Sequence, residues 1–590
     1  MRYEDYSKED LLKIVTKQAE ELKAKKYGLV WDNEKEPEKV VLDCENNFPI
    51  LQRINENEIK TDDSDDNILI EGDNYHALTC LNYTHKGKVD VIYIDPPYNT
   101  RTDGFIYNDK RVDINDGYRH SKWLNFMEKR LKLAKKLLKE DGIIFISIDD
   151  NEFAQLKLLC DKIFFEENFM EIFNIQVRYA SKSLNEKDDF QKLLEYTLCY
   201  SNSKYLFKPN KPKSDYDLDK FRWTILEKSE GEEIVLRNKK VKIFRKGEYE
   251  IIENTSGSID LLKATWASGS VLKGNTSGKF FKDYLEERKS IDGICVLYKV
   301  EGIGEDGLGY RYFTGPKKEN TTKGLFYSGV PINRRSEIEA NGSSDKEKPI
   351  INFYDYSGDF GNIRHEGGIG FRGGKKPIRL IKEFINLHKD KNAVVLDFFA
   401  GSGSTGHAVL DLNLIDQGNR KFILCTDNDE NICSEYCYPR IKNCILGFDN
   451  VEGLGGNLQY FKTDLIPVEK IDRIDDKQRH ELTEKAGQMI AIKENTFVEI
   501  EINMWYQLFE DKNKTKITAI YFREDMEKFE ELIEKIREND VTLYVFSYGR
   551  IDKMLFNYIG KNVKIEDIPE PIIEIYKEIN LSIREAKNNV

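Results

Sequence analysis

The sequence predicts an α/β protein with a doubly wound parallel sheet, a separate inserted unit and a small C-terminal α/β unit. Two observations predict the sheet: apolar, strand-like runs alternate with amphipathic, helix-like stretches before residue 175, and again after residue 375. A third predicts the insertion, because between about 175 and 350 this alternation gives way to mixed Gly, Asn, Ser, Lys and aromatic residues. We therefore expect one sheet whose strands come from two separated parts of the chain.

The first part of the sheet is expected between residues 61 and 175. Residues 67–81 are typical of a strand, a turn and a helix, and residues 89–95 (VDVIYID) form a nearly continuous apolar run. Such a run suits a parallel strand that is covered on both faces. Residues 123–142 predict an amphipathic helix that ends at Gly142, and residues 142–149 predict another buried strand.

The second part follows the inserted segment. Here the sequence predicts a helix over residues 376–388, a strand over 393–399, a tight loop over 401–405, a helix over 406–413 and a strand over 421–427.

The two ends of the chain differ from this pattern. Residues 1–60 are highly charged and predict one helix, over 9–26, followed by an extended arm. Residues 465–590 predict a β-α-β unit with strands over 516–522 and 541–548. This last unit carries a net charge of about −6, which favours a dimer or partner contact over a DNA surface.

Charge and composition limit the classes of function. The whole chain carries a net charge of −13, yet residues 171–380 carry about +6, which is compatible with a DNA-facing groove. The sequence shows neither a signal peptide at its start nor an apolar run of the roughly 18–20 residues that cross a membrane. The nine scattered cysteines suggest reduced thiols, so we expect a cytoplasmic protein without membrane contact.

A glycine-containing loop follows the strand predicted over 393–399. The strand ends at Asp397, and Gly401, Ser402, Gly403 and Thr405 come before the next helix. Glycines allow a sharp turn and a close approach of a ligand to the backbone N–H groups. The spacing lacks both the third glycine of a dinucleotide fingerprint and the GxxxxGK[ST] pattern of a phosphate loop. An acid followed by FxGxG instead suits S-adenosylmethionine, although an ordinary glycine turn has the same appearance.

Two motifs together are more specific than either alone. DPPY (95–98) and FAGSG (399–403) resemble the motifs of amino-group DNA methyltransferases, which make N6-methyladenine or N4-methylcytosine. The catalytic tetrapeptide precedes the cofactor loop by about 300 residues, an order that resembles the β class. The resemblance implies a circularly permuted Rossmann-like methyltransferase domain, over 61–175 and 351–464, with a target recognition domain inserted over 176–350.

Further stretches narrow the resemblance to the modification (Mod) subunits of Type III restriction–modification systems. They are DPPYNTRTDGFIYND (95–109), SIDDNE (147–152), residues 310–331 and GGNLQYFKTDL (455–465). The sequence departs from the family at Arg101, where a glycine is usual, and Gly104 follows. Partners implied by the resemblance are double-stranded DNA, a second copy in a homodimer and an ATP-dependent restriction subunit.

The tetrapeptide has a chemical interpretation. Asp95 and the carbonyl of Pro96 can accept hydrogen bonds from an exocyclic amino group and so make its nitrogen more nucleophilic. Pro96 and Pro97 fix φ and hold that carbonyl in place. Tyr98 offers a ring for stacking on a base that has left the duplex, and Asn99, Phe105 and Tyr107 are candidates to line its pocket.

The resemblance also implies a set of cofactor contacts. Asp73 would contact the adenine, and Lys376 and Pro377 would lie near the methionine moiety. Asp427 can accept ribose hydrogen bonds, with Asn428 or Asp429 as alternatives, or it is an ordinary surface acid. Phe399 either contacts the cofactor or packs in the core. The whole predicted set is Asp73, Lys376, Pro377, Asp397, Phe399, Ala400, Gly401, Ser402, Gly403, Thr405 and Asp427.

Other groups carry weaker predictions. Cys425, Cys433, Cys437 and Cys444 match no zinc spacing, so we expect no metal site. The Lys-rich residues 241–246 and 315–323 are either solvated loops or phosphate contacts.

The function predicted is adenine-N6 methylation of DNA by a Mod-like subunit. Asp at the first tetrapeptide position favours adenine over N4-cytosine, which remains the alternative. Cytosine C5 methylation needs a Pro-Cys pair, and the sequence contains none. A recognition and assembly subunit for a restriction partner is a second class of function and is compatible with the first. RNA methylation is disfavoured by the large inserted segment, which suits a reader of duplex DNA.

Overall fold

The protein is described by a computed structural model that covers residues 38–588, apart from 63, 101–105, 108–109, 113–115, 183–188, 269–270, 272–275, 372–374, 472–473, 524, 557–558 and 561. The helix predicted over 9–26, the residues Arg101, Gly104 and Phe105, and the side chain of Tyr107 lie outside this description. The chain forms two compact units: a larger unit of residues 1–210 and 351–590, and a smaller unit of residues 211–350.

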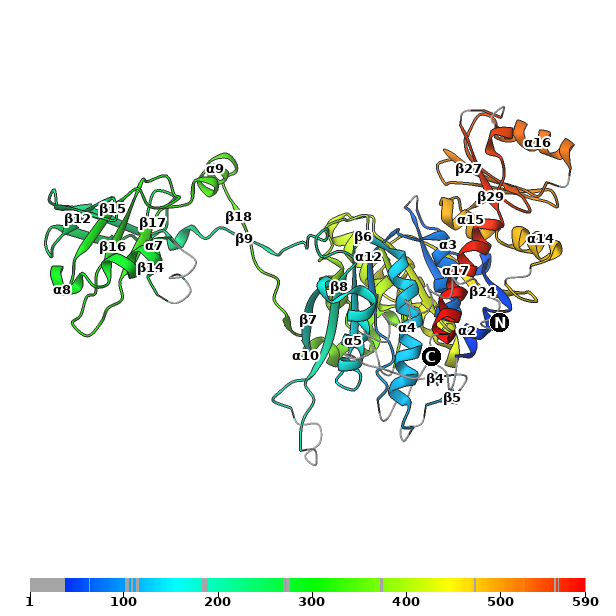
Figure 1. The fold of residues 1–590 in the computed structure, drawn as a ribbon, viewed down its shortest axis with the longest axis horizontal. Helices are drawn as coiled ribbons and strands as arrows, with labels where there is room; N and C mark the ends of the chain where they lie inside the picture. Colours follow the sequence, from blue (N-terminus) through cyan, green and yellow to red (C-terminus); the bar gives the residue numbers. More distant parts are fainter. Residues whose placement is uncertain are drawn as a thin grey trace, which may run out of the picture. The chain divides into compact units, whose positions relative to one another are not determined.

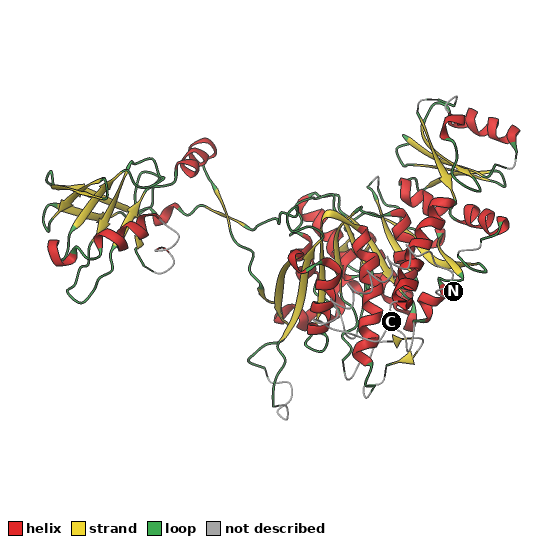
Figure 2. Cartoon of the chain, in the orientation of Figure 1, coloured by secondary structure: helices red, strands yellow, loops and turns green. Residues whose placement is uncertain are grey.

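A mixed sheet of ten strands forms the centre of the larger unit (Figures 1 and 2). In the middle of the sheet, the six neighbouring strands from β24 to β6 run parallel to one another. In spatial order the strands are β1 (Asn47–Arg53), β24 (Asn457–Pro467), β2 (Asp66–Glu71), β21 (Lys421–Thr426), β20 (Val394–Asp397), β3 (Val89–Ile94), β6 (Leu138–Ile148), β8 (Leu194–Ser201), β7 (Phe169–Gln176) and β19 (Phe353–Asp355).

Helices cover both faces of this sheet, which is why its central strands are continuously apolar. All six residues of β3 are buried, as its sequence predicts. One helical layer is α3 (Asn74–Thr84), α4 (Arg119–Leu137) and α5 (Phe153–Phe164); the other is α11 (Ile378–Ile385), α12 (Ser404–Asp416) and α13 (Tyr438–Leu446). The crossovers through α4 and α12 step along the sheet in opposite directions. Because such crossovers are right-handed, the two layers lie on opposite faces.

Strands β3 and β20 are neighbours in the sheet although about 300 residues separate them in sequence. Val91 pairs with Val395 and Ile92 with Leu396. The chain leaves β3 towards β6 and leaves β20 towards β21, so the two strands flank the point at which the winding direction changes. The doubly wound, circularly permuted architecture predicted from the sequence is thereby confirmed.

Two boundaries differ from the prediction. The helix predicted to reach Gly142 ends at Leu137, because Leu138 is already extended (φ −63°, ψ 138°) and begins β6. The Asn202 side-chain amide donates to the carbonyl of Lys139 (3.0 Å) and stabilises this extended start. The smaller unit begins at residue 211, later than 176, because residues 194–201 pair with β6 and β7 in the large sheet.

The smaller unit contains a six-stranded antiparallel sheet. Buried apolar side chains of that sheet and of α7, such as Val241, Phe280 and Phe313, form its core. Its sheet order is β11 (Glu232–Leu236), β12 (Lys239–Phe244), β15 (Leu297–Glu301), β16 (Tyr310–Thr314), β17 (Leu325–Ser328) and β14 (Lys263–Trp266). Further elements are the pairs β10 (Trp223–Glu227) with β13 (Tyr249–Glu253) and β9 (Lys213–Asp215) with β18 (Asp345–Glu347), and the helices α7 (Thr276–Phe280), α8 (Lys289–Asp292) and α9 (Ile332–Asn341).

The C-terminal part of the larger unit has a five-stranded sheet of its own. The predicted β-α-β unit is present as β27, α16 and β28, and three more strands extend it. Helices α15 and α17 pack against α3, and the Tyr576 hydroxyl donates to the Pro49 carbonyl (2.5 Å). The elements are α14 (Asp476–Lys485), α15 (Gly487–Glu494), β25 (Val498–Ile502), β26 (Tyr506–Glu510), β27 (Lys516–Tyr521), α16 (Met526–Ile536), β28 (Asp540–Phe546), β29 (Val563–Ile568) and α17 (Glu570–Asn588). No helix in the described part of the chain is long and apolar enough to span a lipid bilayer.

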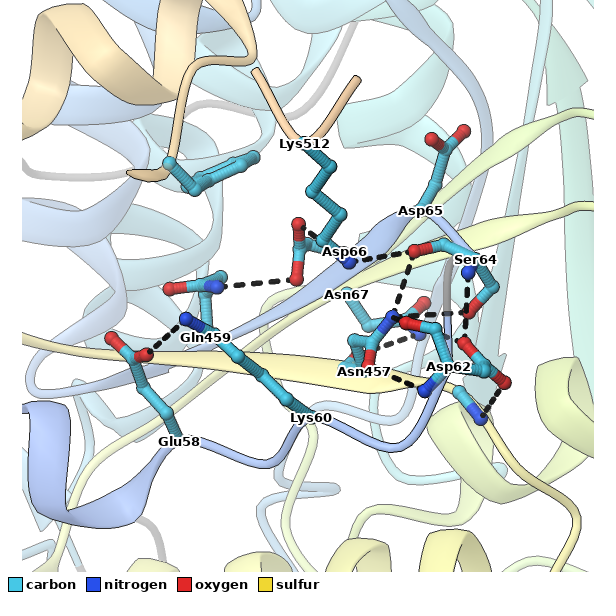
Figure 3. A network of polar contacts seen from close by, with 12 residues as sticks. Glu58, Lys60, Asp62, Ser64, Asp65, Asp66, Asn67, Asn457, Gln459 and Lys512 are labelled. Carbon is cyan, nitrogen blue, oxygen red and sulfur yellow. Dashed lines mark hydrogen bonds and ion pairs between the residues drawn. The ribbon is translucent and has the colours of Figure 1, made fainter. Parts of the chain in front are cut away.

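A polar network joins this C-terminal part to the start of the central strands (Figure 3). The fully buried Asn457, first residue of β24, donates to the carbonyls of Asp62 (3.0 Å) and Ser64 (2.7 Å) and accepts from the Thr61 N–H (2.8 Å). Lys512, in the turn between β26 and β27, donates to the same Ser64 carbonyl (2.7 Å). The network therefore fixes the arm before β2 at the amino ends of the parallel strands.

The network yields a prediction for stability. Asn457→Ala removes the buried amide that holds the partly exposed backbone at Thr61, Asp62 and Ser64, so we expect it to lower the free energy of unfolding by about 1–3 kcal/mol. Chemical denaturation followed by circular dichroism measures the loss. The control is Lys60→Ala, because Lys60 is half exposed and its ion pair with Glu58 is long (3.6 Å); a change of about 0.5 kcal/mol or less is expected there. Equal losses in the two variants would contradict a special role for Asn457.

Candidate active site

The predicted catalytic tetrapeptide forms the tip that follows β3. Asp95, Pro96, Pro97 and Tyr98 come directly after its last residue, Ile94, at the carboxyl ends of the parallel strands. The buried indole of Trp123 in α4 donates to the Pro97 carbonyl (2.6 Å) and holds the tip against the helix. No described residue donates a hydrogen bond to the Pro96 carbonyl.

Four polar side chains converge at the tip. The Tyr98 hydroxyl lies 2.8 Å from Asp95 Oδ1 and 3.2 Å from Glu195 Oε2. Lys376 Nζ lies 2.7 Å from the Tyr98 hydroxyl, 2.7 Å from Glu195 Oε2 and 3.3 Å from Asp95 Oδ1. The contacts to Asp95 reach only Oδ1; no described side chain lies within bonding distance of Oδ2.

Burial and charge set the protonation of this cluster. Burial raises the pKa of the Asp95 carboxyl above its usual range, and the Lys376 ammonium offsets part of that rise. Burial opposes the charge on Lys376, but Asp95 and Glu195 outweigh it, so the pKa of Lys376 is raised and the ammonium stays charged. Burial, together with the two carboxylates, raises the pKa of the Tyr98 hydroxyl well above its usual value. The cluster therefore holds one cation between two acids and a neutral phenol.

The predicted cofactor loop follows β20, the strand next to β3. Asp397, the last residue of β20, accepts from the Phe399 N–H (3.0 Å) and from the Thr405 hydroxyl (2.5 Å), which closes the loop onto α12. Gly401 (φ 49°) and Gly403 (φ 78°) both have left-handed backbone conformations, which glycine adopts without strain. A Cβ at Gly403 would lie 3.2 Å from Cys437 Sγ, so the loop packs closely on the helical layer behind it.

The loop presents open donors on the other side. Within the described residues, no acceptor reaches the backbone N–H groups of Gly401 or Ser402. Asp427 follows β21, the next strand of the sheet, and desolvation, with repulsion from Asp429 and Asp73, raises the pKa of its carboxyl to about 6. Open N–H groups beside an acid suit a ligand that carries a carboxylate, an amino group and hydroxyls, as S-adenosylmethionine does.

The remaining predicted cofactor residues occupy different settings. Asp73 caps α3 by accepting from the Tyr75 N–H (2.7 Å), and its other oxygen lies 3.5 Å from Arg130. Pro377 is the N-cap of α11, directly after Lys376. Phe399 is partly buried against Phe126 (ring centroids 5.8 Å apart). Ala400 follows it, and its N–H donates to the Cys425 carbonyl of β21 (3.1 Å).

Comparison with known proteins gives this arrangement a family. The profile of a family described as "DNA methylase", covering N6 and N4 methylases, matches residues 89–437. The chain belongs to this DNA methylase family. The Mod subunit of the Type III restriction–modification enzyme EcoPI from Escherichia phage P1 is 31% identical over 72% of this chain and 67% of its own length. The StyLTI Mod subunit of Salmonella typhimurium is 31% identical over 64% of this chain and 55% of its own length.

The chain also matches solved structures, at low sequence identity and low TM-score. The M1.HpyAVI–SAM complex is 12% identical, with a TM-score of 0.26, over 63% of this chain and 98% of the matched chain. The cytosine-N4-specific PvuII DNA methyltransferase is 12% identical, with a TM-score of 0.31, over 66% and 88%. The predicted resemblance to Type III Mod subunits is confirmed by the sequence relatives, and the family's methyl donor is S-adenosylmethionine.

The structure adds residues to the DNA methylase site that the sequence did not single out. Glu195, near the start of β8, joins the Asp95 cluster from the antiparallel side of the sheet. The Asn99 amide donates to Glu152 Oε1 (2.5 Å), and His120 Nδ1 lies 2.6 Å from the same oxygen. Burial raises the pKa of Glu152 to about 8. In the sequence, Glu152 is part of the SIDDNE motif, but the motif alone does not show which residues it contacts.

Arg440 in α13 supports the glycine loop after Asp397 from behind. Its guanidinium is fully buried and donates to the hydroxyls of Ser404 (2.7 Å) and Ser402 (3.2 Å). Its second terminal nitrogen pairs with Glu366 (2.9 Å), in the segment that leads to Lys376. The loop and the lysine-bearing segment are thus fixed by one arginine.

This contact predicts a loss of cofactor affinity on substitution. Arg440→Lys keeps the charge but not the fork that reaches both serines and Glu366, so we expect S-adenosylmethionine to bind about tenfold more weakly by isothermal titration calorimetry. Lys442→Arg on the exposed face of α13 is the control and should leave the affinity unchanged. Wild-type affinity for S-adenosylmethionine in Arg440→Lys would contradict the supporting role of Arg440.

A second prediction concerns pH. Burial raises the pKa of Asp397 to about 7 from an ordinary 3.8, although the Thr405 and Phe399 hydrogen bonds oppose the rise. Between these two values the folded protein binds the proton more tightly than the unfolded chain. The contribution of Asp397 to the free energy of unfolding therefore falls by up to about 1.4 kcal/mol per pH unit as pH rises. In Asp397→Asn this decline should be absent, so its stability relative to wild type should increase from pH 5 to pH 7.

Thermal melts without cofactor at pH 5, 6, 7 and 8 measure this difference. Asp416→Asn is the control, because hydrogen bonds from Arg420 lower the pKa of Asp416 and leave its charge constant over this range. A stability difference between Asp397→Asn and wild type that does not change with pH would show that Asp397 is ionised throughout.

Proposed function

We propose that this DNA methylase transfers a methyl group from S-adenosylmethionine to the N6 amino group of an adenine turned out of double-stranded DNA. One observation carries the proposal: the Asp95–Tyr98 tip and the glycine loop after Asp397 follow two directly paired parallel strands. A base amino group at the first and a methyl donor at the second would meet at one edge of the sheet.

The tip supplies the acceptors for the amino group. Asp95 Oδ2 and the Pro96 carbonyl lack partners among the described residues, whereas Oδ1 and the Pro97 carbonyl are already engaged. Two acceptors aimed at the amino hydrogens draw the nitrogen lone pair out of the ring and make it nucleophilic. Because Trp123 and Lys376 fix the tip beforehand, little reorganisation is needed during the reaction.

The cofactor is held by the residues around β20 and β21. The N–H groups of Gly401 and Ser402 and the carboxyl of Asp427 are the proposed contacts, with Asp73, Asp397, Phe399 and Lys376 around them. When bound, S-adenosylmethionine supplies an electrophilic methyl group, whose bond to sulfur breaks as the new bond to nitrogen forms. The protein's part is to orient the amino nitrogen and to accept the proton that this nitrogen loses after the transfer.

The rest of the chain is proposed to provide recognition and assembly. Residues 211–350 fall within the basic part of the sequence and would read the DNA, with the Lys-rich residues 241–246 and 315–323 on phosphates. The relatives are named Mod subunits of Type III restriction–modification enzymes, so a restriction subunit is the proposed partner. The C-terminal part, residues 465–590, is the proposed dimer or partner contact.

One experiment tests the reaction. The purified protein is incubated with S-adenosylmethionine and unmethylated genomic DNA, and modified bases are mapped by direct sequencing. We expect N6-methyladenine at one short sequence motif. N4-methylcytosine would favour the alternative specificity, and the absence of any modified base would contradict the proposal.

The role of Asp95 has its own test. Asp95→Ala removes an acceptor for the amino group, so kcat should fall by at least about 10³-fold. Binding of S-adenosylmethionine should change by less than about threefold, because the proposed cofactor contacts follow other strands. Asp141→Ala, at an exposed position of β6, is the matched control and should keep wild-type kcat. An active Asp95→Ala enzyme would rule out the mechanism.

A further inference from the structure

Glu195 occupies a position that the proposed methyl transfer does not use. The Tyr98 hydroxyl lies between two carboxylates, 2.8 Å from Asp95 Oδ1 and 3.2 Å from Glu195 Oε2. Lys376 Nζ lies 2.7 Å from both the Tyr98 hydroxyl and Glu195 Oε2. The Tyr98 hydroxyl can donate one hydrogen bond and accept two. It therefore lies as a bridge between Asp95 and Glu195.

The reaction needs such a connection, because amino-group methylation releases a proton. Once the amino nitrogen has bonded to the methyl carbon, it carries a positive charge and two N–H bonds. Loss of one proton restores neutrality, and the nearest free base is Asp95 Oδ2. A protonated Asp95 cannot accept a hydrogen bond from the next amino group at that oxygen, so the proton has to leave before another turnover.

We propose that Glu195 receives this proton from Asp95 through the hydroxyl of Tyr98, an inference that rests on the proposed function. The proton moves from the amino nitrogen to Asp95 Oδ2. A half-turn of the carboxyl group about its broad terminal torsion presents the O–H to the Tyr98 oxygen. Tyr98 takes this proton while its own passes to Glu195 Oε2, so Asp95 is again an anion, Tyr98 is again neutral and Glu195 is a neutral acid that releases the proton to water.

Exposure and charge support this direction of transfer. The Glu195 side chain is 25% exposed and that of Asp95 20%, but Glu195 stands on β8, outside the β3 tip that the base would cover. Lys376 hydrogen-bonds to both Tyr98 and Glu195, but it cannot accept the proton, because the surrounding acids keep its ammonium group protonated. Its two hydrogen bonds instead hold the hydroxyl and the Glu195 carboxylate in the bridging geometry.

The inference predicts a separation between the first and later turnovers. Glu195→Gln preserves size and a hydrogen-bond acceptor for Lys376 but cannot take up a proton. Asp95 begins as an anion in a fresh enzyme, so the first-turnover rate in rapid quench should stay within about twofold of wild type. The steady-state rate should fall by about tenfold or more, because Asp95 is not reset. S-adenosylmethionine affinity and melting temperature should match wild type, and both are measured without turnover.

Two further variants complete the test. In Glu195→Ala, added formate should restore part of the steady-state rate, because a small carboxylate can occupy the vacated space and accept the proton. Glu171→Gln makes the same substitution at an exposed position of the neighbouring β7 and should behave as wild type.

The outcomes separate the two proposals. A wild-type steady-state rate in Glu195→Gln would overturn the relay while leaving the methyltransferase assignment intact. Equal losses in first-turnover and steady-state rates, or a loss of cofactor affinity, would overturn it in favour of a purely structural role. Failure of the wild-type protein to methylate any DNA would overturn the proposed function itself.

Discussion

The site depends on one backbone interaction, the parallel pairing of β3 with β20. Val91 and Ile92 lie in register with Val395 and Leu396, and both strands are buried on both faces. Because parallel strands end at the same edge, this register places Asp95 and Asp397 at one edge of the sheet although they are far apart in sequence. Other features of the fold are compatible with that pairing, namely the helical layers, the reversal of winding direction and the insertion of the smaller unit. None of these features alone would bring the two strand ends together.

The charges at this edge follow from the same constraint. Desolvation raises the pKa values of both Asp95 and Asp397; repulsion from Glu195 adds to the rise at Asp95, and repulsion from Asp95 adds to the rise at Asp397. Lys376 offsets part of this cost at Asp95. The buried Arg440 is neutralised separately by Glu366 while it holds Ser402 and Ser404 of the glycine loop. Each cation contacts two separate segments of the chain, so the electrostatic compensation also fixes the relative position of those segments.

Local sequence patterns predicted the strands and the loops of the site but not the side chains that support them. The apolar run before Asp95 and the glycines after Asp397 are contiguous signals, and the structure places both at one edge. Glu195 carries no such signal, because its role arises from the antiparallel pairing of β8 with β6. Arg440 is likewise one basic residue in an amphipathic helix until its burial is known. The sequence pattern also misplaces the end of α4. It predicts that the helix ends at Gly142, but Gly142 lies inside β6.

The position of Glu195 and Lys376 in the chain explains how the larger unit tolerates an insertion beside its active site. Glu195 precedes residues 211–350 and Lys376 follows them, and the two side chains pair directly at 2.7 Å. The Asn210 N–H donates to the Leu387 carbonyl (2.8 Å) and ties the same two segments together a second time. Loop-closure entropy grows only slowly with loop length. Once these contacts fix the two ends, the length and sequence of the inserted residues have little effect on the geometry around Asp95. The sequence of residues 211–350 can therefore change with little effect on the arrangement of Asp95, Tyr98 and Glu195.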